Sequence, residues 1–429
     1  MKNNKQHIIL SVYTNLSRFV LAFVFLFSGF VKANDPLGFY YKLQDYLTAF
    51  QLIDYFPESL LLFGAIVIAA LEFMLGVYLL FGINRRFTSY LVTVLMLFMT
   101  PLTLYLALKN PISDCGCFGD AVVLSNWQTF GKNLLLLIAA FSVLRWKDSI
   151  FRFVTHRSEW FISIYSLTFI LFISHFCLEH LPIFDFRPYS IGTNIPDQMA
   201  MPADKEGPTY ESIFVLEKDG KQQEFSLEDY PDSTWTFIDR KTVLKDQGYI
   251  PPIHDFSIIR QEDNKDITEE ILTNPSYTIL LIAHRLEQAD DGNTDLVNEL
   301  YDYCTQYHYP FYCITSSSKE EMTIWKEKTG AEYPFCNADD TTLKTIIRSN
   351  PGIVLLKGGN IINKWSHRDT PDEYQLTDSL DKLALGKEQE LGVLQKTGTT
   401  LAWFILPLMS LIIIDRLYLR WNNSRRVKK

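Results

Sequence analysis

The chain contains 429 residues, which is enough for two or three domains, and 48% of them are hydrophobic. Its net charge is −9 and no segment forms a basic stripe, so nucleic acid is excluded as the expected partner. The average composition combines two unlike regions. Apolar runs dominate from about Leu16 to His180, whereas roughly Pro182 to Lys396 has the composition of a soluble domain. We therefore expect lipid around the first region and water around the second.

Six apolar runs are candidates for membrane-spanning helices, since a spanning helix needs about 20 mostly apolar residues. They are Leu16–Val31, Ser59–Ile83, Phe87–Leu108, Phe130–Leu144, Trp160–Leu178 and Thr399–Leu419. The first run has no small-residue cleavage site and further runs follow it, so we interpret it as a span and not as a cleaved signal peptide. A buried core helix is the alternative for each run, above all for the last, which Asp415 interrupts. The pattern predicts a multi-span α-helical membrane bundle.

Lysine and arginine mark one side of the membrane, because cytoplasmic loops carry an excess of these residues. The alternation of the short loops predicts that both termini are cytoplasmic. It places the loop around Cys115 and the soluble region 183–396 on the other side, so the predicted location is an inner (cytoplasmic) membrane with residues 183–396 in the periplasm. The residues that mark the cytoplasmic side are Lys2, Lys5, Arg18, Arg85, Arg86, Arg145, Lys147, Arg152, Arg157, Arg416, Arg420, Arg425, Arg426, Lys428 and Lys429.

The segment Asp35–Asp54 follows the first run and carries apolar residues at helical spacing. This pattern is typical of an amphipathic helix that lies along the membrane–water boundary. The spacing therefore predicts a helix on the outer surface of the bundle, between the first and second spans.

Glu72 is a carboxylate inside the second apolar run. A charge at the bilayer centre costs about 2.5–3.5 kcal/mol on insertion scales, so we expect Glu72 to face the bundle interior and to find a partner. Arg18, Lys32 and Lys132 lie near helix ends and are the candidate partners. Three interpretations stay open: an ion pair that specifies the bundle, a group that accepts a proton or binds a quinone headgroup, and a side chain that reaches the membrane boundary.

Two cysteines one residue apart lie just outside the third run, in the sequence Asp114-Cys115-Gly116-Cys117-Phe118-Gly119-Asp120. In an oxidising compartment such a pair can cycle between dithiol and disulfide, and the glycines permit the turn that the small ring requires. A thiolate metal site and two unreactive cysteines are the alternatives. Metal is disfavoured, because no nearby Cys or His completes a tetrahedral set of ligands. We interpret Cys115 and Cys117 as candidate catalytic residues, together with Glu72.

The N-terminal part resembles the DoxX family and, within that superfamily, the MauE branch. The residues that carry the resemblance are Arg18, Gly29, Lys32, Glu72 and Gly76, then the Cys-Gly-Cys-Phe-Gly run with Trp127 and Lys132-Asn133. The resemblance covers about residues 10–150 and implies a four-helix bundle with thiol–disulfide chemistry outside the membrane. MauE-like proteins are associated with maturation of a disulfide-rich periplasmic enzyme, and some DoxX relatives with quinone-linked oxidation. A quinone is thus the candidate cofactor, and Arg18, Lys32 and Lys132 are the candidate cofactor-binding residues.

Cys177 lies near the end of the fifth run, between His175 and His180. The spacing resembles that of metal or haem ligands, but the three side chains point around the helix and not to one face. We therefore interpret Cys177 as a packing residue at the membrane interface. A tether rich in proline and aspartate follows, from Pro182 to about Tyr210.

A small β unit is expected after the tether. Ser212–Leu216 and Gln222–Leu227 alternate around Lys218-Asp219-Gly220, and an Asp-Gly pair is a strong hairpin signal. Trp235–Ile238 is a plausible third strand.

From Pro252 the pattern changes to alternating strands and helices. Strands are expected at His254–Ile258, Tyr277–Ala283, Tyr309–Thr315, Asn350–Leu356 and Ile361–Trp365, and helices at Leu296–Tyr307, Lys319–Gly330 and Thr341–Ile347. Over about residues 250–385 this order resembles the thioredoxin fold of TlpA-like and peroxiredoxin-like proteins. In that fold the proline that opens a strand is cis, so Pro351 is the candidate for this position.

The thioredoxin-like region lacks the cysteine pair that active members carry. The pair would follow Tyr277–Ala283, but the chain continues as His284-Arg285-Leu286-Glu287-Gln288-Ala289-Asp290-Asp291. We therefore exclude disulfide exchange by the usual pair. His284 and Arg285 could bind an anionic group, although a solvated loop is the simpler interpretation. The other cysteines, Cys304, Cys313 and Cys336, are interpreted as small buried residues. Cys336 precedes a polar turn and could be more exposed, and a Cys304–Cys313 bridge is left open.

The sequence thus divides into a bundle at 10–180, a tether and β unit at 183–250, a thioredoxin-like domain at 251–390 and a last span at 398–420. Two functions are compatible with it. In the first, the membrane protein passes thiol–disulfide electrons between an extracytoplasmic protein partner and a membrane acceptor such as a quinone. In the second, it is a non-enzymatic, membrane-anchored binding or assembly factor that uses its inactive thioredoxin-like domain.

Overall fold

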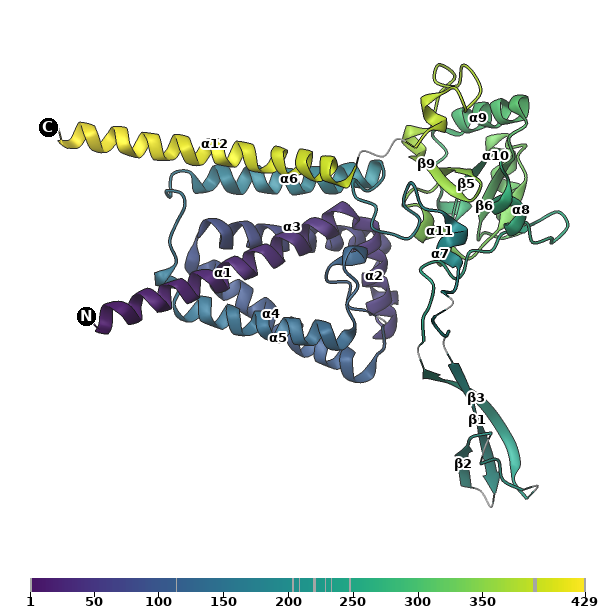
Figure 1. The fold of residues 1–429 in the computed structure, drawn as a ribbon, viewed down its shortest axis with the longest axis horizontal. Helices are drawn as coiled ribbons and strands as arrows, with labels where there is room; N and C mark the ends of the chain where they lie inside the picture. The colour runs from purple at the N-terminus through teal and green to yellow at the C-terminus, as the bar shows by residue number, and fades with distance from the viewer. Residues whose placement is uncertain are drawn as a thin grey trace.

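Figure 1 shows a bundle of long helices, an α/β domain beside one end of the bundle, and a small sheet that projects from the α/β domain. Both ends of the chain lie at the opposite end of the bundle (Figure 1). We call the end that faces the α/β domain the domain-side end. The computed structural model describes residues 2–112, 114–202, 204–207, 209–218, 221–227, 229–232, 234–246, 248–388 and 392–427.

Six helices in the described residues are long and apolar enough to cross a membrane, which confirms the six predicted spans and a multi-pass membrane protein. They are α1 (Lys2–Asn34), α3 (Glu58–Phe81), α4 (Arg85–Lys109), α5 (Asn126–Arg145), α6 (Glu159–Glu179) and α12 (Val393–Val427). Asp415, which interrupts the last apolar run, accepts hydrogen bonds from the hydroxyl groups of Thr155 and Ser158 at 2.7 Å. These bonds explain how a carboxylate is tolerated in α12.

A short helix, α2 (Pro36–Ala49), lies across the domain-side end of the bundle (Figure 1). Asp35 caps it by accepting a hydrogen bond from the Gly38 backbone N–H at 2.9 Å, and Pro36 occupies the first helical position. The apolar face of α2 packs through Tyr40 against Leu61 of α3. The helix predicted within Asp35–Asp54 is therefore present, and its position at a membrane boundary stays a prediction.

The α/β domain is built on a six-stranded mixed sheet in the order β4-β7-β6-β5-β8-β9. Strands β5, β6 and β7 are parallel, whereas β8 and β9 run antiparallel to their neighbours. The strands are β4 (Ile259–Arg260), β5 (Tyr277–Ile282), β6 (Phe311–Thr315), β7 (Phe335–Asn337), β8 (Gly352–Lys357) and β9 (Asn360–Ser366). All six residues of β5 are buried, because alternate side chains enter two apolar clusters on opposite faces of the sheet.

Helices cover both faces of this sheet. Side chains of α9 (Thr294–Tyr307) and α10 (Lys319–Thr329) fill one apolar cluster. Those of α7 (Ile195–Met199), α8 (Thr268–Thr273) and α11 (Asp340–Ile346) fill the other. The helices predicted at Leu296–Tyr307, Lys319–Gly330 and Thr341–Ile347 are therefore confirmed. The helices α7 and α8 were not predicted, because they are too short to show a helical period in the sequence.

Two strand predictions in this domain need comment. His254–Ile258 is not a strand; pairing starts only at Ile259, and the segment instead buries Phe256 and Ile258 in the cluster beneath α11. The alternation of apolar residues in this segment therefore reflects burial and not pairing with a neighbouring strand. The strand β7 was not predicted, because its three residues lie in a segment that resembles a turn. The Asn350–Pro351 peptide bond is cis, as predicted.

The projecting sheet has β1 (Thr209–Lys218) between β2 (Lys221–Phe225) and β3 (Thr236–Asp246), all antiparallel. The predicted third strand is thus confirmed and is longer than expected. The predicted turn residues Asp219 and Gly220 lie outside the described residues.

The tether after α6 is fixed to the α/β domain by a buried ion-pair cluster. Asp185 Oδ2 lies 2.8 Å from Lys364 Nζ, and Asp185 Oδ1 lies 2.8 Å from Arg187 Nε. Burial alone would raise the pKa of Asp185, but the charges of Lys364 and Arg187 outweigh burial and hold this pKa below its usual range. The tether therefore leaves the bundle along a defined path.

Candidate functional site

The candidate site begins with a close crossing of α1 and α3. A Cβ at Gly29 would lie 2.4 Å from the Phe73 backbone nitrogen, and one at Gly76 would lie 2.6 Å from the Leu26 backbone nitrogen. Only glycine at both positions permits this approach of the two backbones. The crossing brings polar residues in the last turns of α1 beside Glu72 of α3.

Glu72 pairs with Lys32, one of its three predicted partners. Lys32 Nζ lies 2.6 Å from Glu72 Oε2, and the two side chains are 5% and 13% exposed. The Ser28 hydroxyl oxygen, one helical turn before Lys32, lies 2.7 Å from the same carboxylate oxygen and accepts from Lys32 Nζ at 2.8 Å. Ser28 was not predicted, although its spacing of four residues from Lys32 places both on one helix face.

The structure places Cys115 and Cys117 in a disulfide bond within the loop that connects α4 to α5. Gly116 between them has a φ of +64°, and Gly119 has a φ of +49°, in the region that favours glycine. A Cβ at Gly116 would also lie 2.6 Å from Lys42 Cγ of α2. The glycines therefore serve the turn, as expected from the sequence.

The backbone of this loop is bound to the Lys32–Glu72 pair. The Cys117 carbonyl oxygen accepts a hydrogen bond from Lys32 Nζ at 3.2 Å and lies 2.7 Å from the Ser28 hydroxyl oxygen. The Ser28 proton can go to only one of its two acceptors at a time, Glu72 or the Cys117 carbonyl. The predicted residues Cys117, Glu72 and Lys32 thus form one contiguous polar cluster.

Lys132 of α5 lies at the same cavity as this cluster. The cavity has a volume of about 40 Å³, and its lining includes Glu72, Lys32, Cys117, Phe118 and Lys132. Lys132 Nζ lies 4.1 Å from the centre of the Phe118 ring, which is cation–π geometry. A cavity of this size holds one or two water molecules, because a water molecule occupies about 30 Å³.

Helix α2 covers the other side of the disulfide loop. Lys42 Nζ lies 3.1 Å from Asp114 Oδ2, and the Tyr46 hydroxyl donates to the Cys115 carbonyl at 3.0 Å. Burial raises the pKa of Tyr46, so its hydroxyl remains a donor at neutral pH. Cys115 is 6% exposed, whereas Cys117 is more accessible. The two cysteines consequently have different surroundings.

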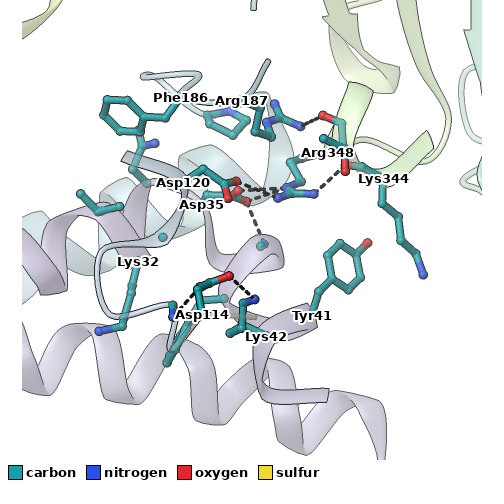
Figure 2. A pocket seen from close by; sticks show the side chains of 18 of the residues that line it. Lys32, Asp35, Tyr41, Lys42, Asp114, Asp120, Phe186, Arg187, Lys344 and Arg348 are labelled. Carbon is teal, nitrogen blue, oxygen red and sulfur yellow. Dashed lines mark hydrogen bonds and ion pairs between the residues drawn. The ribbon is translucent and has the colours of Figure 1, made fainter. Parts of the chain in front are cut away.

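The α/β domain reaches this loop through Arg348, next to α11. Figure 2 shows the guanidinium pointing at Asp35, the cap of α2, and at Asp120 of the loop. Arg348 Nε lies 2.9 Å from Asp35 Oδ2, and Arg348 Nη2 lies 3.5 Å from Asp120 Oδ2. The Asp35 and Asp120 charges outweigh burial and raise the pKa of Arg348. The side chain is 8% exposed, so this contact is a buried junction of domain and bundle.

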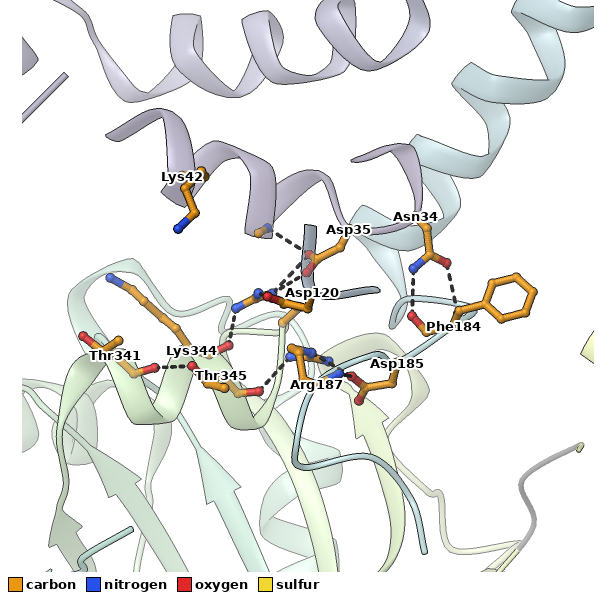
Figure 3. A network of polar contacts seen from close by, with 12 residues as sticks. Asn34, Asp35, Lys42, Asp120, Phe184, Asp185, Arg187, Thr341, Lys344 and Thr345 are labelled. Carbon is orange, nitrogen blue, oxygen red and sulfur yellow. Dashed lines mark hydrogen bonds and ion pairs between the residues drawn. The ribbon is translucent and has the colours of Figure 1, made fainter. Parts of the chain in front are cut away.

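A cavity of about 290 Å³ lies at this junction, between α2, the disulfide loop, the tether and α11 (Figure 2). Figure 3 shows the polar contacts on its tether side. The Asn34 side chain donates to the Phe184 carbonyl at 2.8 Å and accepts from the Phe184 N–H at 3.0 Å, and Arg187 donates to the Thr345 carbonyl at 3.1 Å. The junction is thus fastened at several points.

Arg18, predicted as a cofactor-binding residue, does not join the cluster. It is fully buried, donates to the Phe151 carbonyl at 2.7 Å and has its guanidinium 4.5 Å from the Phe19 ring centre. Ten residues of α1 separate it from Ser28, which corresponds to about 15 Å along a helix. Arg18 is therefore not the partner of Glu72, because it binds the connection between α5 and α6 at the opposite end of the bundle. Its assignment as a cofactor-binding residue stays a prediction.

The end of β5 that leads into His284 and Arg285 faces α2. His284 and Arg285 line a cavity of about 410 Å³ that Tyr40 and Gln44 of α2 also line. Burial and then the charge of Lys344 lower the pKa of His284 to about 4, so His284 is neutral at pH 7. This edge of the domain is directed at the bundle, and the anion site suggested for Arg285 stays a prediction.

The remaining cysteines are free and buried. Burial raises the pKa of Cys304 to about 12, and burial raises that of Cys336, which is fully buried, to the same value. Their interpretation as apolar packing residues is confirmed. The alternative of a more exposed Cys336 is excluded, because β7 carries this residue into the core, and Cys304 and Cys313 form no bridge.

Comparison with known proteins adds one result for the bundle. Residues 9–145 match the family described as methylamine utilisation protein MauE. The match covers about a third of the chain and spans α1 to α5, so the N-terminal membrane part is MauE-like. Residues 210–247, in the projecting sheet, match a domain of unknown function (DUF8463). No curated protein and no solved structure matches the chain.

Proposed function

We propose that the bundle exchanges disulfides with an extracytoplasmic thiol protein and passes the electrons to an acceptor in the membrane. The observation that carries this proposal is the position of the Cys115–Cys117 pair. The pair lies on a glycine loop whose Cys117 carbonyl is bound by Lys32 and Ser28, beside Glu72. A cysteine pair that can exchange disulfides and a carboxylate that can carry a proton thus lie side by side at one end of the bundle.

The exchange proceeds in two steps. A partner thiolate attacks one sulfur, the Cys115–Cys117 bond breaks, a mixed disulfide forms and the other cysteine leaves as a thiolate. A second partner thiol then displaces the mixed disulfide, so that the partner is oxidised and the bundle holds a dithiol. Two electrons and two protons have moved to the bundle. An acceptor of the quinone class takes up both, becomes a quinol and restores the disulfide.

Glu72 is the proposed proton carrier of this cycle. It is the carboxylate at the cavity that Cys117 also lines, and Ser28 provides a hydroxyl between Glu72 and the Cys117 carbonyl. The cavity is too small to enclose a quinone ring, so a quinone would dock at its membrane face, where Lys132 is the proposed contact. Lys32 fixes the position of the loop relative to Glu72, because its ammonium group binds both the Cys117 carbonyl and the Glu72 carboxylate.

The α/β domain is proposed to be a thioredoxin-like domain that recognises the partner. Its support is the strand order β6-β5-β8-β9, with β5 parallel to β6 and β8 antiparallel to both neighbours. Residues 284–291 contain no cysteine, so recognition and chemistry would be divided between the domain and the bundle.

The proposed location is an inner membrane, with both termini in the cytoplasm and the α/β domain in the periplasm. The alternation of Lys and Arg supports this orientation, and so does their gathering in the structure. Arg85 donates to the Ile150 carbonyl, and Arg416 donates to the Phe153 carbonyl, at the end of the bundle away from the domain. Reporter fusions after Lys147 and after Ser190 should report opposite sides of the membrane.

The test is the thiol state of Cys115 and Cys117 in intact membranes. Membranes are acid-quenched, alkylated, reduced and relabelled, and the loop peptide is read by mass spectrometry before and after addition of a dithiol and then a quinone. We expect a reversible shift between dithiol and disulfide, lost in Cys115→Ser and in Cys117→Ser but kept in the matched control Cys177→Ser. A pair that stays permanently bonded or permanently free would overturn the proposal.

That negative outcome would favour the second candidate, a non-enzymatic anchored binding or assembly factor. The observation on its side is the domain, which keeps a sheet and a docked edge but no reactive cysteine. Under this alternative, Cys115→Ser and Cys117→Ser would leave partner binding intact, whereas removal of the α/β domain would abolish it.

A further inference from the structure

The membrane cavity beside Cys117 contains one positive charge more than it can pair. Glu72 is matched by Lys32 at 2.6 Å. Lys132 contributes a second ammonium group, and within the described part of the chain no carboxylate lies within ion-pairing distance of it. Its contact is the face of the Phe118 ring. With all three groups ionised, the cavity carries a net charge of +1.

An unmatched ammonium group near the membrane is costly, and intramembrane charges usually face a counter-ion. A ring face compensates only part of this cost. Among the described residues that line the cavity, Glu72 is the single carboxylate, and it is occupied by Lys32 and Ser28. A lining group that is neutral in the disulfide form can supply the missing anion once it ionises.

Cys117 is such a group. In the disulfide its sulfur is neutral, but each sulfur of a reduced pair can become a thiolate. Cys117 lines the cavity together with Lys132, and Phe118, on which the ammonium group rests, is the next residue along the chain. Cys115 differs, because it does not line this cavity and its carbonyl is bound by Tyr46 of α2.

Lys32 is the other cation near Cys117, but its donors are already in use. An ammonium group has three N–H donors. Those of Lys32 reach Glu72 at 2.6 Å, Ser28 at 2.8 Å and the Cys117 carbonyl at 3.2 Å. Lys132 has no hydrogen-bond partner among the described residues, so its donors are available.

We propose that Lys132 is the counter-ion of the Cys117 thiolate when the disulfide is reduced. The inference rests on the proposed function, in which the dithiol is a working state, and it assigns Cys117 as the sulfur that faces the membrane acceptor. On reduction, the Cys117 thiol gives its proton to water and its sulfur takes the negative charge. The net charge of the cavity then falls from +1 to zero, which favours the thiolate over the thiol.

The test measures the alkylation rate of Cys117 by iodoacetamide against pH, in full-length protein in lipid nanodiscs. Cys115→Ser is the parent variant, because it leaves Cys117 without a disulfide partner. The charged and titratable groups that face the loop are Lys32 from α1, Lys42 and Tyr46 from α2, Glu72 from α3, Lys132 from α5, Arg348 from the α/β domain, and Asp114 and Asp120 from the loop itself.

Lys132→Met in the parent should move the midpoint of the rate profile to higher pH and slow alkylation at pH 7 about tenfold. Lys132→Arg should keep the parental profile, because it keeps the charge. Lys109→Met, which removes an exposed lysine at the same end of the bundle, is the matched control and should change nothing. Lys132→Gln repeats the test with a polar side chain if the methionine variant does not fold.

A Lys132→Met or Lys132→Gln profile that coincides with that of the parent would overturn the inference. The two proposals fail separately. If Lys132 shifts the profile but the pair never cycles in membranes, the proposed function is wrong and the counter-ion stands. If the pair cycles and the profile does not depend on residue 132, the reverse holds.

Discussion

The disulfide loop of the bundle and the strand edge of the α/β domain both lie beside α2, yet the two regions differ in the surroundings of their cysteines. The loop holds Cys115 and Cys117 on glycine turns, next to ionised side chains. The domain has no cysteine at its strand edge and encloses Cys304 and Cys336 in apolar clusters. The difference teaches that surroundings, and not the presence of sulfur, decide where thiol chemistry can occur.

The largest expected effect is a difference in thiol reactivity. After reduction of the folded protein, the accessible Cys117 should be alkylated roughly a thousandfold faster at pH 7 than Cys304 and Cys336. Burial raises the pKa of both domain cysteines from 9.0 to about 12, which lowers the thiolate fraction by about three powers of ten. Mass spectrometry of time-resolved labelling measures the ratio. Comparable rates for Cys117, Cys304 and Cys336 would remove the contrast between loop and domain.

The next effect is on the stability of the bundle. Glu72→Gln leaves Lys32 buried without its counter-charge and should cost about 3–5 kcal/mol, because breaking a buried ion pair strands a charge. The double variant Lys32→Met/Glu72→Gln should cost clearly less, since both charges are gone. Thermal unfolding in detergent compares the two. An equal loss in both would mean that packing, and not charge, holds this end of the bundle.

The stability of the α/β domain should depend on pH, because the burial of His284 at the domain edge disfavours its charged form. His284 has a folded pKa of about 4 against 6.5 when unfolded. The unfolded state therefore binds the extra proton, and stability should be constant above about pH 6.5 and fall by about 3 kcal/mol as the pH drops to about 4. His284→Gln should remove this dependence. Denaturant unfolding of the domain, followed by Trp325 fluorescence, tests it; an identical slope in both proteins would assign the loss to other groups.

Within the bundle, the close crossing of α1 and α3 is tested by comparing alanine substitutions at two glycines. Gly29→Ala should destabilise by about 1–3 kcal/mol, because the new Cβ would meet the Phe73 backbone. The matched control Gly64→Ala meets no atom within 4 Å and should stabilise α3 by about 0.5–1 kcal/mol. Opposite signs in thermal unfolding support the close crossing, and a neutral Gly29→Ala would exclude it.

The smallest expected effect concerns the junction itself. Arg348→Met removes the link between Asp35 and Asp120, so reduction of the disulfide by dithiothreitol should become about fivefold faster, which corresponds to about 1 kcal/mol of local opening. Arg368→Met is the matched control, because its pair with Glu179 is exposed and contributes about 0–1 kcal/mol. A rate unchanged by Arg348→Met would show that the domain does not restrain the loop.

Much of the molecule could be predicted from local features of the chain. Span lengths, the spacing of Cys115 and Cys117, and the need of Glu72 for a partner depend on residues close together in sequence. The same holds for most strands and helices of the α/β domain and for the absence of cysteine from residues 284–291. These features are local because hydropathy, turn chemistry and helical or strand period act within a window of a few turns.

Only the tertiary structure decided which residues meet. It chose Lys32 and not Arg18 for Glu72, since the crossing angle and the glycine contacts of α1 and α3 set that pairing. It also placed Arg348 on the disulfide loop, more than two hundred residues from its partners in the sequence. Such contacts depend on the packing of whole elements, and packing is summed over many side chains that no local pattern contains.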